Sequence, residues 1–262
     1  MKISETTGDA PPQAISPQAI VATWPRSTPA IAPWWHTILL IAVILTTSLL
    51  SSLQSGKDNL AAGHMRHYLT SIAWEWILAV FAWWGIRMRR VPLRQLLGQR
   101  RSGWKMWIRD FGIALLFWIV ALIVLTAAAT VLRLLHLMTA QKAITALAPQ
   151  GWREILVWLA LCITAGVMEE FLFRGYLLQQ FSSLGRHDHG NLWLGVIVSS
   201  LLFGIAHGYE GIGAMIAISL FGALFSTLAI KRRSLRAGMM AHAWHDAIAG
   251  IALAITKHLH AL

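Results

Sequence analysis

Cysteine and acidic side chains are scarce in this sequence of 262 residues, and charged residues of all kinds make up only 13% of it. The single cysteine, Cys162, excludes an intramolecular disulfide, and its apolar neighbours predict a packing role. So few charges, beside 56% hydrophobic residues and a mean hydropathy of +0.58, exclude an ordinary soluble domain. The composition instead predicts a protein that crosses a membrane several times.

Several motifs are also absent. We find no HExxH pattern, so the usual zinc-peptidase helix is missing, and neither GxSG nor GxGD occurs. No internal repeat indicates a transporter built from two halves. These absences remove several common classes of membrane enzyme and transporter.

Basic residues outnumber acidic ones by 22 to 11, and they lie in blocks between apolar runs. Eight basic residues and no acidic one fall between Arg87 and Arg109, and a second cluster covers residues 231–236. Such blocks are typical of cytoplasmic loops, so we expect a lipid bilayer and no nucleic acid as the partner of this charge.

The apolar runs predict an all-α, polytopic transmembrane bundle of about seven helices, within a range of six to eight. We expect an interfacial helix on the outer side at residues 133–150; if it re-enters the membrane, the count changes by one. The helix from residue 152 is about 50 Å long, so it must tilt, break or project. The expected spans are residues 35–53, 68–86, 111–132, 152–184, 192–207, 214–230 and 237–256.

The chain divides into three predicted regions. Residues 1–33 are polar and rich in proline, which predicts a disordered cytoplasmic tail and not a signal peptide. Residues 34–150 hold the first helices and the basic loop, and residues 151–256 hold the predicted catalytic core. With the basic segments inside, we expect a multi-pass protein of the cell (plasma) membrane whose N-terminus, 87–109 loop, turn at Arg186 and 231–236 cluster are cytoplasmic.

Three ionisable residues, Glu169, Glu170 and Arg174, stand inside the apolar helix that begins at residue 152. Each charge at the centre of a membrane helix costs about 2.5–3.5 kcal/mol unless it is paired or faces water. Glu170 and Arg174 are four residues apart and can pair, whereas Glu169 points about 140° away from Arg174. A plain salt bridge would explain the pair alone, but it leaves Glu169 as a free carboxylate.

Two further helices carry polar residues at four-residue spacing, namely Phe203 with His207 and His242 with Asp246. Glu170 lies 15 residues before the turn at 185–190 and His207 lies 17 residues after it. Both are therefore about 22–26 Å along their helices from the turn and can meet at one depth. Each histidine alone could be a packing residue. Together the groups favour general-base chemistry, with a carboxylate that takes a proton from water.

The order EExxxR, FxxxH and HxxxD resembles the CAAX-processing and bacteriocin-processing (CPBP) family of intramembrane proteases, which includes type II CAAX prenyl endopeptidases. The resemblance covers residues 150–256. It implies that Glu169 and His207 activate the attacking water, that Glu170 pairs with Arg174, and that His242 and Asp246 stabilise the oxyanion. Asp246 stands where eukaryotic members of the family have Asn, so it either donates as a protonated acid or only orients His242.

The resemblance implies an intramembrane endopeptidase that cleaves a membrane peptide or a lipidated protein, of prenylated CAAX type or bacteriocin-like. The sequence leaves two other functions open, a proton-coupled transporter and a non-catalytic immunity or scaffold protein. It also leaves open whether Glu169, His207 and His242 bind Zn²⁺ or the site works without a cofactor.

Overall fold

The computed structural model describes residues 30–54, 63–98, 103–138, 147–184 and 191–259. Every regular element in these ranges is helical, apart from a single β-bridge between Gly98 and Ser234. The predicted helical membrane bundle is therefore confirmed. The elements are α2 (Trp34–Gln54), α3 (His64–Met88), α4 (Leu93–Leu97), α5 (Trp104–Leu134), α7 (Trp152–Glu169), the π-helical segment η2 (Glu170–Leu177), α8 (Leu178–Ser182), α9 (Leu192–Ala206), the short η3 (Gly208–Glu210), α10 (Ile212–Arg232) and α11 (Arg236–Leu259).

Five helices among the described residues are long and apolar enough to cross a membrane: α2, α3, α5, the continuous helix from α7 through α8, and α10. Helix α9 is apolar but has only 15 residues. Helix α11 has 24 residues, but His242, His245 and Asp246 lower its hydropathy, and it is not among the five. The total of about seven spans therefore stays a prediction.

The segments between the apolar runs differ from the sequence-based expectation. Part of the basic loop is helical, because α5 already begins at Trp104 and Pro92 precedes the short helix α4. The interfacial helix predicted at 133–150 is not found in the described residues 135–138 and 147–151. A positive φ of 56° at His136 follows the end of α5 and is incompatible with a continued helix. The remainder of that prediction, and the turn at 185–190, lie outside the described residues.

The end of the predicted tail is ordered. Ile31 and Ala32 are buried, and the side-chain amide of Gln180 binds both backbone groups of Ala32. It accepts a hydrogen bond from the Ala32 N–H at 3.1 Å and donates one to its carbonyl at 3.0 Å. The prediction of disorder is therefore wrong for residues 30–33, while residues 1–29 lie outside the described part of the chain.

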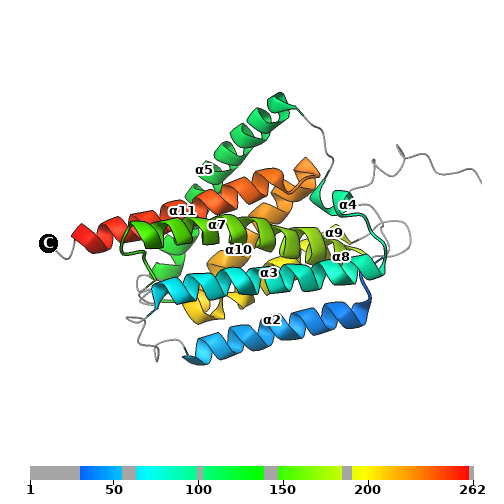
Figure 1. Ribbon diagram of the computed structural model, residues 1–262, viewed down its shortest axis with the longest axis horizontal. Helices are drawn as coiled ribbons and strands as arrows, with labels where there is room; N and C mark the ends of the chain where they lie inside the picture. Colours follow the sequence, from blue (N-terminus) through cyan, green and yellow to red (C-terminus); the bar gives the residue numbers. More distant parts are fainter. Residues whose placement is uncertain (1–29, 55–62, 99–102, 139–146, 185–190, 260–262) are drawn as a thin grey trace, which may run out of the picture.

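Helix α7 lies between α3 and α11, and the hairpin of α9 and α10 packs against the continuation of this helix in η2 and α8 (Figure 1). Helices α3 and α7 run parallel. His64 contacts Glu154 at 3.2 Å near the start of both helices, and one turn further on Tyr68 packs edge-on against Trp158. With this register, the middle of α3 packs beside the middle of α7.

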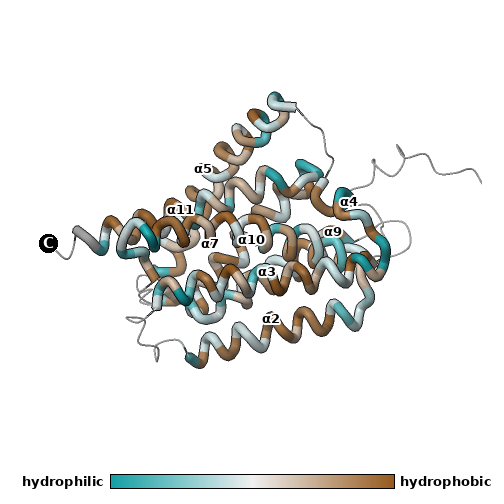
Figure 2. Tube along the Cα trace, in the orientation of Figure 1, coloured by the Kyte–Doolittle hydropathy of each residue, from teal (hydrophilic) through white to brown (hydrophobic). Residues whose placement is uncertain are grey.

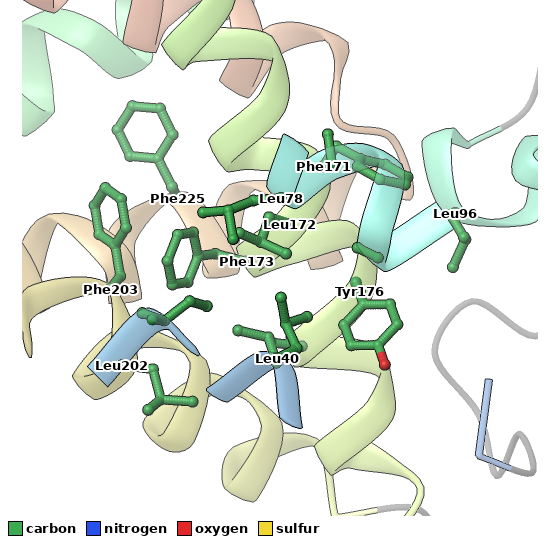
Figure 3. Close-up of a cluster of buried hydrophobic side chains, with 14 of the residues drawn as sticks. Leu40, Leu78, Leu96, Phe171, Leu172, Phe173, Tyr176, Leu202, Phe203 and Phe225 are labelled. Atoms are coloured by element: carbon green, nitrogen blue, oxygen red, sulfur yellow. The ribbon is translucent and has the colours of Figure 1, made fainter. Parts of the chain in front are cut away.

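The bundle has an apolar interior and an apolar exterior (Figure 2). Aromatic and leucine side chains from α2, α3, α9 and α10 surround η2, as Figure 3 shows for Leu40, Leu78, Phe203 and Phe225. Large apolar side chains also cover the outside of the bundle; Leu134 of α5, for example, is 74% exposed. An exterior of this kind suits contact with lipid, as the composition predicts.

Candidate active site

The long helix changes its winding where the acidic pair stands. Residues Glu170–Leu177 form a π-helix between α7 and α8, and all eight of these residues are buried. The long helix, predicted to tilt, break or project, runs without interruption from α7 through α8 and changes its hydrogen bonding locally in η2. Such π-helical insertions are costly and occur most often at functional sites.

Contacts from α2 hold the π-helical segment in place. The hydroxyl of Tyr176 lies 3.0 Å from Nδ1 of His36 and 2.9 Å from the hydroxyl of Thr37. The other ring nitrogen of His36 donates to the carbonyl of Phe81 in α3 at 3.0 Å. Since that nitrogen is the donor, a neutral His36 accepts the Tyr176 proton at Nδ1. These hydrogen bonds connect α2, α3 and η2 at Tyr176, six residues after Glu170.

Glu170 and Arg174 form a sealed ion pair. Their closest atoms are 2.9 Å apart, and their side chains are 0% and 1% exposed. The Arg174 guanidinium also lies 4.3 Å from the centre of the Phe203 ring and 5.5 Å from that of Phe225. Pairing and aromatic contact together offset the cost of removing this cation from water.

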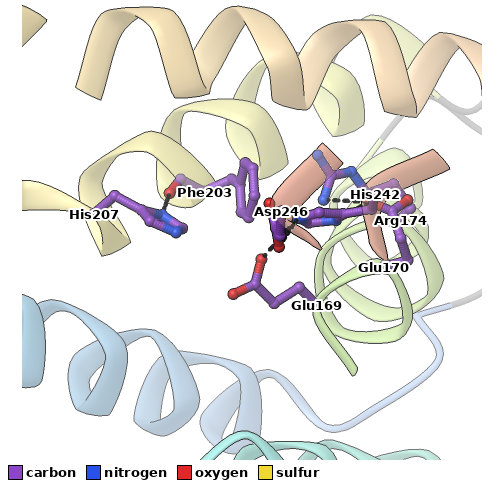
Figure 4. Close-up of polar contacts among 7 residues, drawn as sticks. All are labelled: Glu169, Glu170, Arg174, Phe203, His207, His242 and Asp246. Atoms are coloured by element: carbon purple, nitrogen blue, oxygen red, sulfur yellow. Dashed lines mark hydrogen bonds and ion pairs between the residues drawn. The ribbon is translucent and has the colours of Figure 1, made fainter. Parts of the chain in front are cut away.

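His242 of α11 joins the two glutamates (Figure 4). Its Nδ1 lies 3.1 Å from Glu170 Oε1, and its Nε2 lies 3.5 Å from Glu169 Oε2 and 3.6 Å from Asp246 Oδ2. Because the Glu170 carboxylate is paired with Arg174 and can only accept, Nδ1–H of His242 donates to it. The imidazole is thereby fixed with Nε2 turned toward Glu169 and Asp246.

Close helix packing makes this contact possible. A Cβ atom at Gly166 of α7 would stand 2.8 Å from the backbone nitrogen of Ala243, and one at Gly238 of α11 would stand 3.0 Å from Glu170 Oε2. Side chains at these two positions would push α7 and α11 apart. The glycines therefore set the distance at which His242 reaches both glutamates.

The adjacent glutamates differ in exposure. Glu170 is fully buried, whereas Glu169 is 13% exposed and Asp246 is 31% exposed. Glu169 and Asp246 are thus the carboxylates of this group that water can reach.

His207 stands apart from this group (Figure 4). It follows the last residue of α9, and its Nδ1 donates to the carbonyl of Phe203 at 2.9 Å. The Phe203 ring packs edge-on against both His207 and His242, with centroid distances of 5.0 and 5.9 Å. His207 is still close enough to Asp246 to interact with it electrostatically. With Nδ1 used as a donor, Nε2 of a neutral His207 is left as an acceptor.

A zinc site does not fit this geometry. Across the described ranges of the chain, no three His, Cys, Asp or Glu side chains are grouped so that they could hold a metal ion. The candidate ligands Glu169, His207 and His242 are therefore not assembled as a ligand set, and we derive no step through a metal.

Two acidic residues near the site were missed by sequence reasoning. Glu75 of α3 forms a side-chain hydrogen bond with Glu169. Glu210 of η3 interacts electrostatically with Glu169 and His207; burial raises its pKa, and His207 opposes that shift. An acidic residue inside an apolar run was the available signal for Glu75, the same signal that marked Glu169. For Glu210, which follows a predicted span, the sequence offers no comparable signal.

Comparison with known families supports an enzyme. Residues 151–248 match the family model described as type II CAAX prenyl endopeptidase Rce1-like, which confirms the family resemblance drawn from the three motifs. The matched region runs from α7 to beyond Asp246 in α11. No curated protein and no solved structure matches the chain. The family supports an intramembrane endopeptidase in general, acting on a membrane peptide.

Proposed function

From the match of residues 151–248 to the Rce1-like endopeptidase family, we propose that this protein hydrolyses a peptide bond of a membrane-associated substrate with water activated by Glu169. The observation that supports this role most directly is the unequal environment of the two glutamates. Glu170 is sealed and paired with Arg174, whereas Glu169 is partly exposed and turned toward His242 and Asp246. Of the two adjacent glutamates, only Glu169 combines access to water with a place beside the fixed His242 ring, as a general base requires.

The surrounding residues have distinct tasks in this mechanism. Glu169 takes a proton from water, and His207 orients that water through its free Nε2. The hydroxide attacks the carbonyl carbon, and Glu169 then returns the proton to the leaving amine. When doubly protonated, His242 keeps Nδ1–H on Glu170 and offers Nε2–H to the developing oxyanion. Asp246, on the same side of the His242 ring, orients it.

The substrate is a peptide held at the membrane. The family description names CAAX prenyl substrates, so a prenylated CAAX-type peptide is the first candidate, and a bacteriocin-like peptide is the second. The apolar exterior of the bundle suits contact with a lipid-anchored or membrane-inserted chain.

The direct test is peptide release in liposomes. The purified full-length protein is incubated with prenylated CAAX peptides and with unmodified membrane peptides, and the products are identified by mass spectrometry. We expect a defined cleavage product that disappears in the Glu169→Gln variant. Solute or proton movement without any peptide product would contradict the proposal and favour the transporter.

We further propose that the protein resides in the cell membrane with its N-terminus in the cytoplasm. The basic segments at 87–109 and 231–236 support this orientation. The parallel course of α3 and α7 agrees with it, since both helices should then end on the cytoplasmic side. In intact cells, a Ser102→Cys variant should not be labelled by an impermeant thiol reagent added from outside. Labelling would contradict the proposed orientation.

A further inference from the structure

A third carboxyl group reaches the proposed base from a helix outside the matched region. Glu75 lies in the middle of α3, and its side chain forms a hydrogen bond with Glu169. The register of α3 and α7 independently brings these positions together. His64 opposite Glu154 and Tyr68 opposite Trp158 are each offset by 90 residues, which places residue 75 within about one turn of Glu169.

Two carboxyl groups can form this bond only if one of them carries a proton, because a carboxylate has no donor. Both groups lie inside an apolar bundle, where two adjacent negative charges repel strongly. The wider charge balance points the same way. Five carboxyl groups, Glu75, Glu169, Glu170, Glu210 and Asp246, interact with one another and with one permanent cation, Arg174, and the histidines His207 and His242. A shared proton reduces this excess of negative charge.

We propose that Glu75 is a positioning residue that holds one proton and donates it in a hydrogen bond to the ionised carboxylate of Glu169. The bond keeps Glu169 ionised as the base and fixes the direction of its free oxygen. During turnover the proton from water travels to Glu169 and then to the leaving amine, while the proton of Glu75 is not consumed. This inference rests on the proposed function for its catalytic meaning, but the pairing can be measured without turnover.

The first experiment compares the pH dependence of kcat for peptide cleavage in two variants. Glu75→Leu removes the donor, so kcat should fall about tenfold or more, the scale of one hydrogen bond to a charged group. Its acid limb should move to higher pH, since Glu169 then loses its ionised form more readily. Glu75→Gln supplies an amide donor, so it should recover most of kcat, and its alkaline limb should move to higher pH because the amide cannot be deprotonated.

The control is Glu154→Gln, which removes an acid from the same α3–α7 contact at its other end. Its pH profile should match that of the unchanged protein. The other titratable groups that act on Glu169 are Arg174 of η2, His242 and Asp246 of α11, and Tyr209 and Glu210 of η3, and all remain in every variant. Equal losses of kcat in Glu75→Gln and Glu75→Leu, with unchanged pH limbs, would overturn the inference and leave a structural role.

The second experiment is infrared spectroscopy of the carboxylic acid C=O band in liposomes. The unchanged protein should show a protonated carboxyl band that Glu75→Gln removes and Glu154→Gln retains. Persistence of the full band in Glu75→Gln would place the proton elsewhere and overturn the inference. If the unchanged protein cleaves no peptide, the proposed function fails, but the infrared result still decides the pairing.

Discussion

The two halves of the candidate site have opposite surroundings. One half consists of Glu170, Arg174 and the Nδ1 side of His242, and its carboxylate is 0% exposed. The other half consists of Glu169, Asp246 and the Nε2 side of His242, and its carboxylates are 13% and 31% exposed. A single imidazole ring separates them. We therefore expect the sealed half to fix the geometry of the site and the accessible half to carry out its chemistry.

This difference explains how an apolar bundle retains so many charges. In the sealed half each charge has a partner at hydrogen-bond distance and an aromatic wall, so its desolvation is offset locally. In the accessible half, His242 Nε2 lies 3.5 Å from Glu169 and 3.6 Å from Asp246, and both carboxylates are partly exposed. Substitutions in the first half should change stability, and substitutions in the second should change activity.

The largest effect expected is that of Glu169→Gln on catalysis. Removal of the proposed base should lower kcat by a factor of about 10²–10⁴, the usual contribution of general-base catalysis. The fold should persist, since Glu169 is partly exposed and Gln can keep its polar contacts. Peptide cleavage assays in liposomes, together with thermal unfolding in detergent, measure both quantities. Substantial remaining activity would remove Glu169 from the chemical step.

Glu170→Gln should act on stability. It strands Arg174 in a sealed, apolar environment and weakens the charge on which His242 depends, so the free energy of unfolding should fall by about 3–5 kcal/mol. Thermal unfolding in detergent and protein abundance in the membrane are the readouts. Activity should fall as well, because His242 loses its orientation.

A double variant separates the two contributions of Glu170. Combining Glu170→Gln with Arg174→Leu removes both charges and should restore much of the stability while leaving activity low. Equal loss of stability in Glu169→Gln and Glu170→Gln, without recovery in the double variant, would mean that the two halves have been assigned to the wrong carboxylates.

Much of this arrangement could be predicted from the sequence. The apolar runs indicate a helical membrane bundle, and the four-residue spacing of Glu170 and Arg174 indicates their ion pair, because both depend on local periodicity. The bond from His242 to Glu170 could not be predicted. It depends on the distance between α7 and α11, which Gly166 and Gly238 set, and no spacing along the chain reports that distance.

Other features depend on contacts across long stretches of sequence. Within the π-helical η2, Tyr176 contacts His36 and Thr37, which are 140 and 139 residues away. Glu75 reaches Glu169 through the register of two parallel helices, although nothing near residue 75 in the chain indicates its partner. The sequence identifies candidate residues, but tertiary packing decides which of them meet.

A charge cluster outside the site tests whether a buried, paired carboxylate stabilises the fold without affecting activity. Asp110 of α5 is 2% exposed and pairs with Arg232 at 2.9 Å and with Arg236 at 2.7 Å. Asp110→Asn should lower the free energy of unfolding by about 1.5–3 kcal/mol, since two arginines lose a charged partner. Peptide cleavage per folded molecule should stay unchanged. A loss of specific activity would show that this cluster contributes to the site.

The smallest effect expected is that of Tyr176→Phe, which removes one hydroxyl from the sealed half. The loss takes a hydrogen bond from both His36 and Thr37, so the free energy of unfolding should fall by about 1 kcal/mol. If these contacts hold the π-helical winding, kcat should also fall, because η2 carries Glu170 and thereby orients His242. Thr37→Val is the matched control: it keeps the bond from Tyr176 to His36 and should leave kcat closer to that of the unchanged protein. Equal kcat values in Tyr176→Phe and the unchanged protein would show that the winding of η2 persists without its contact to α2.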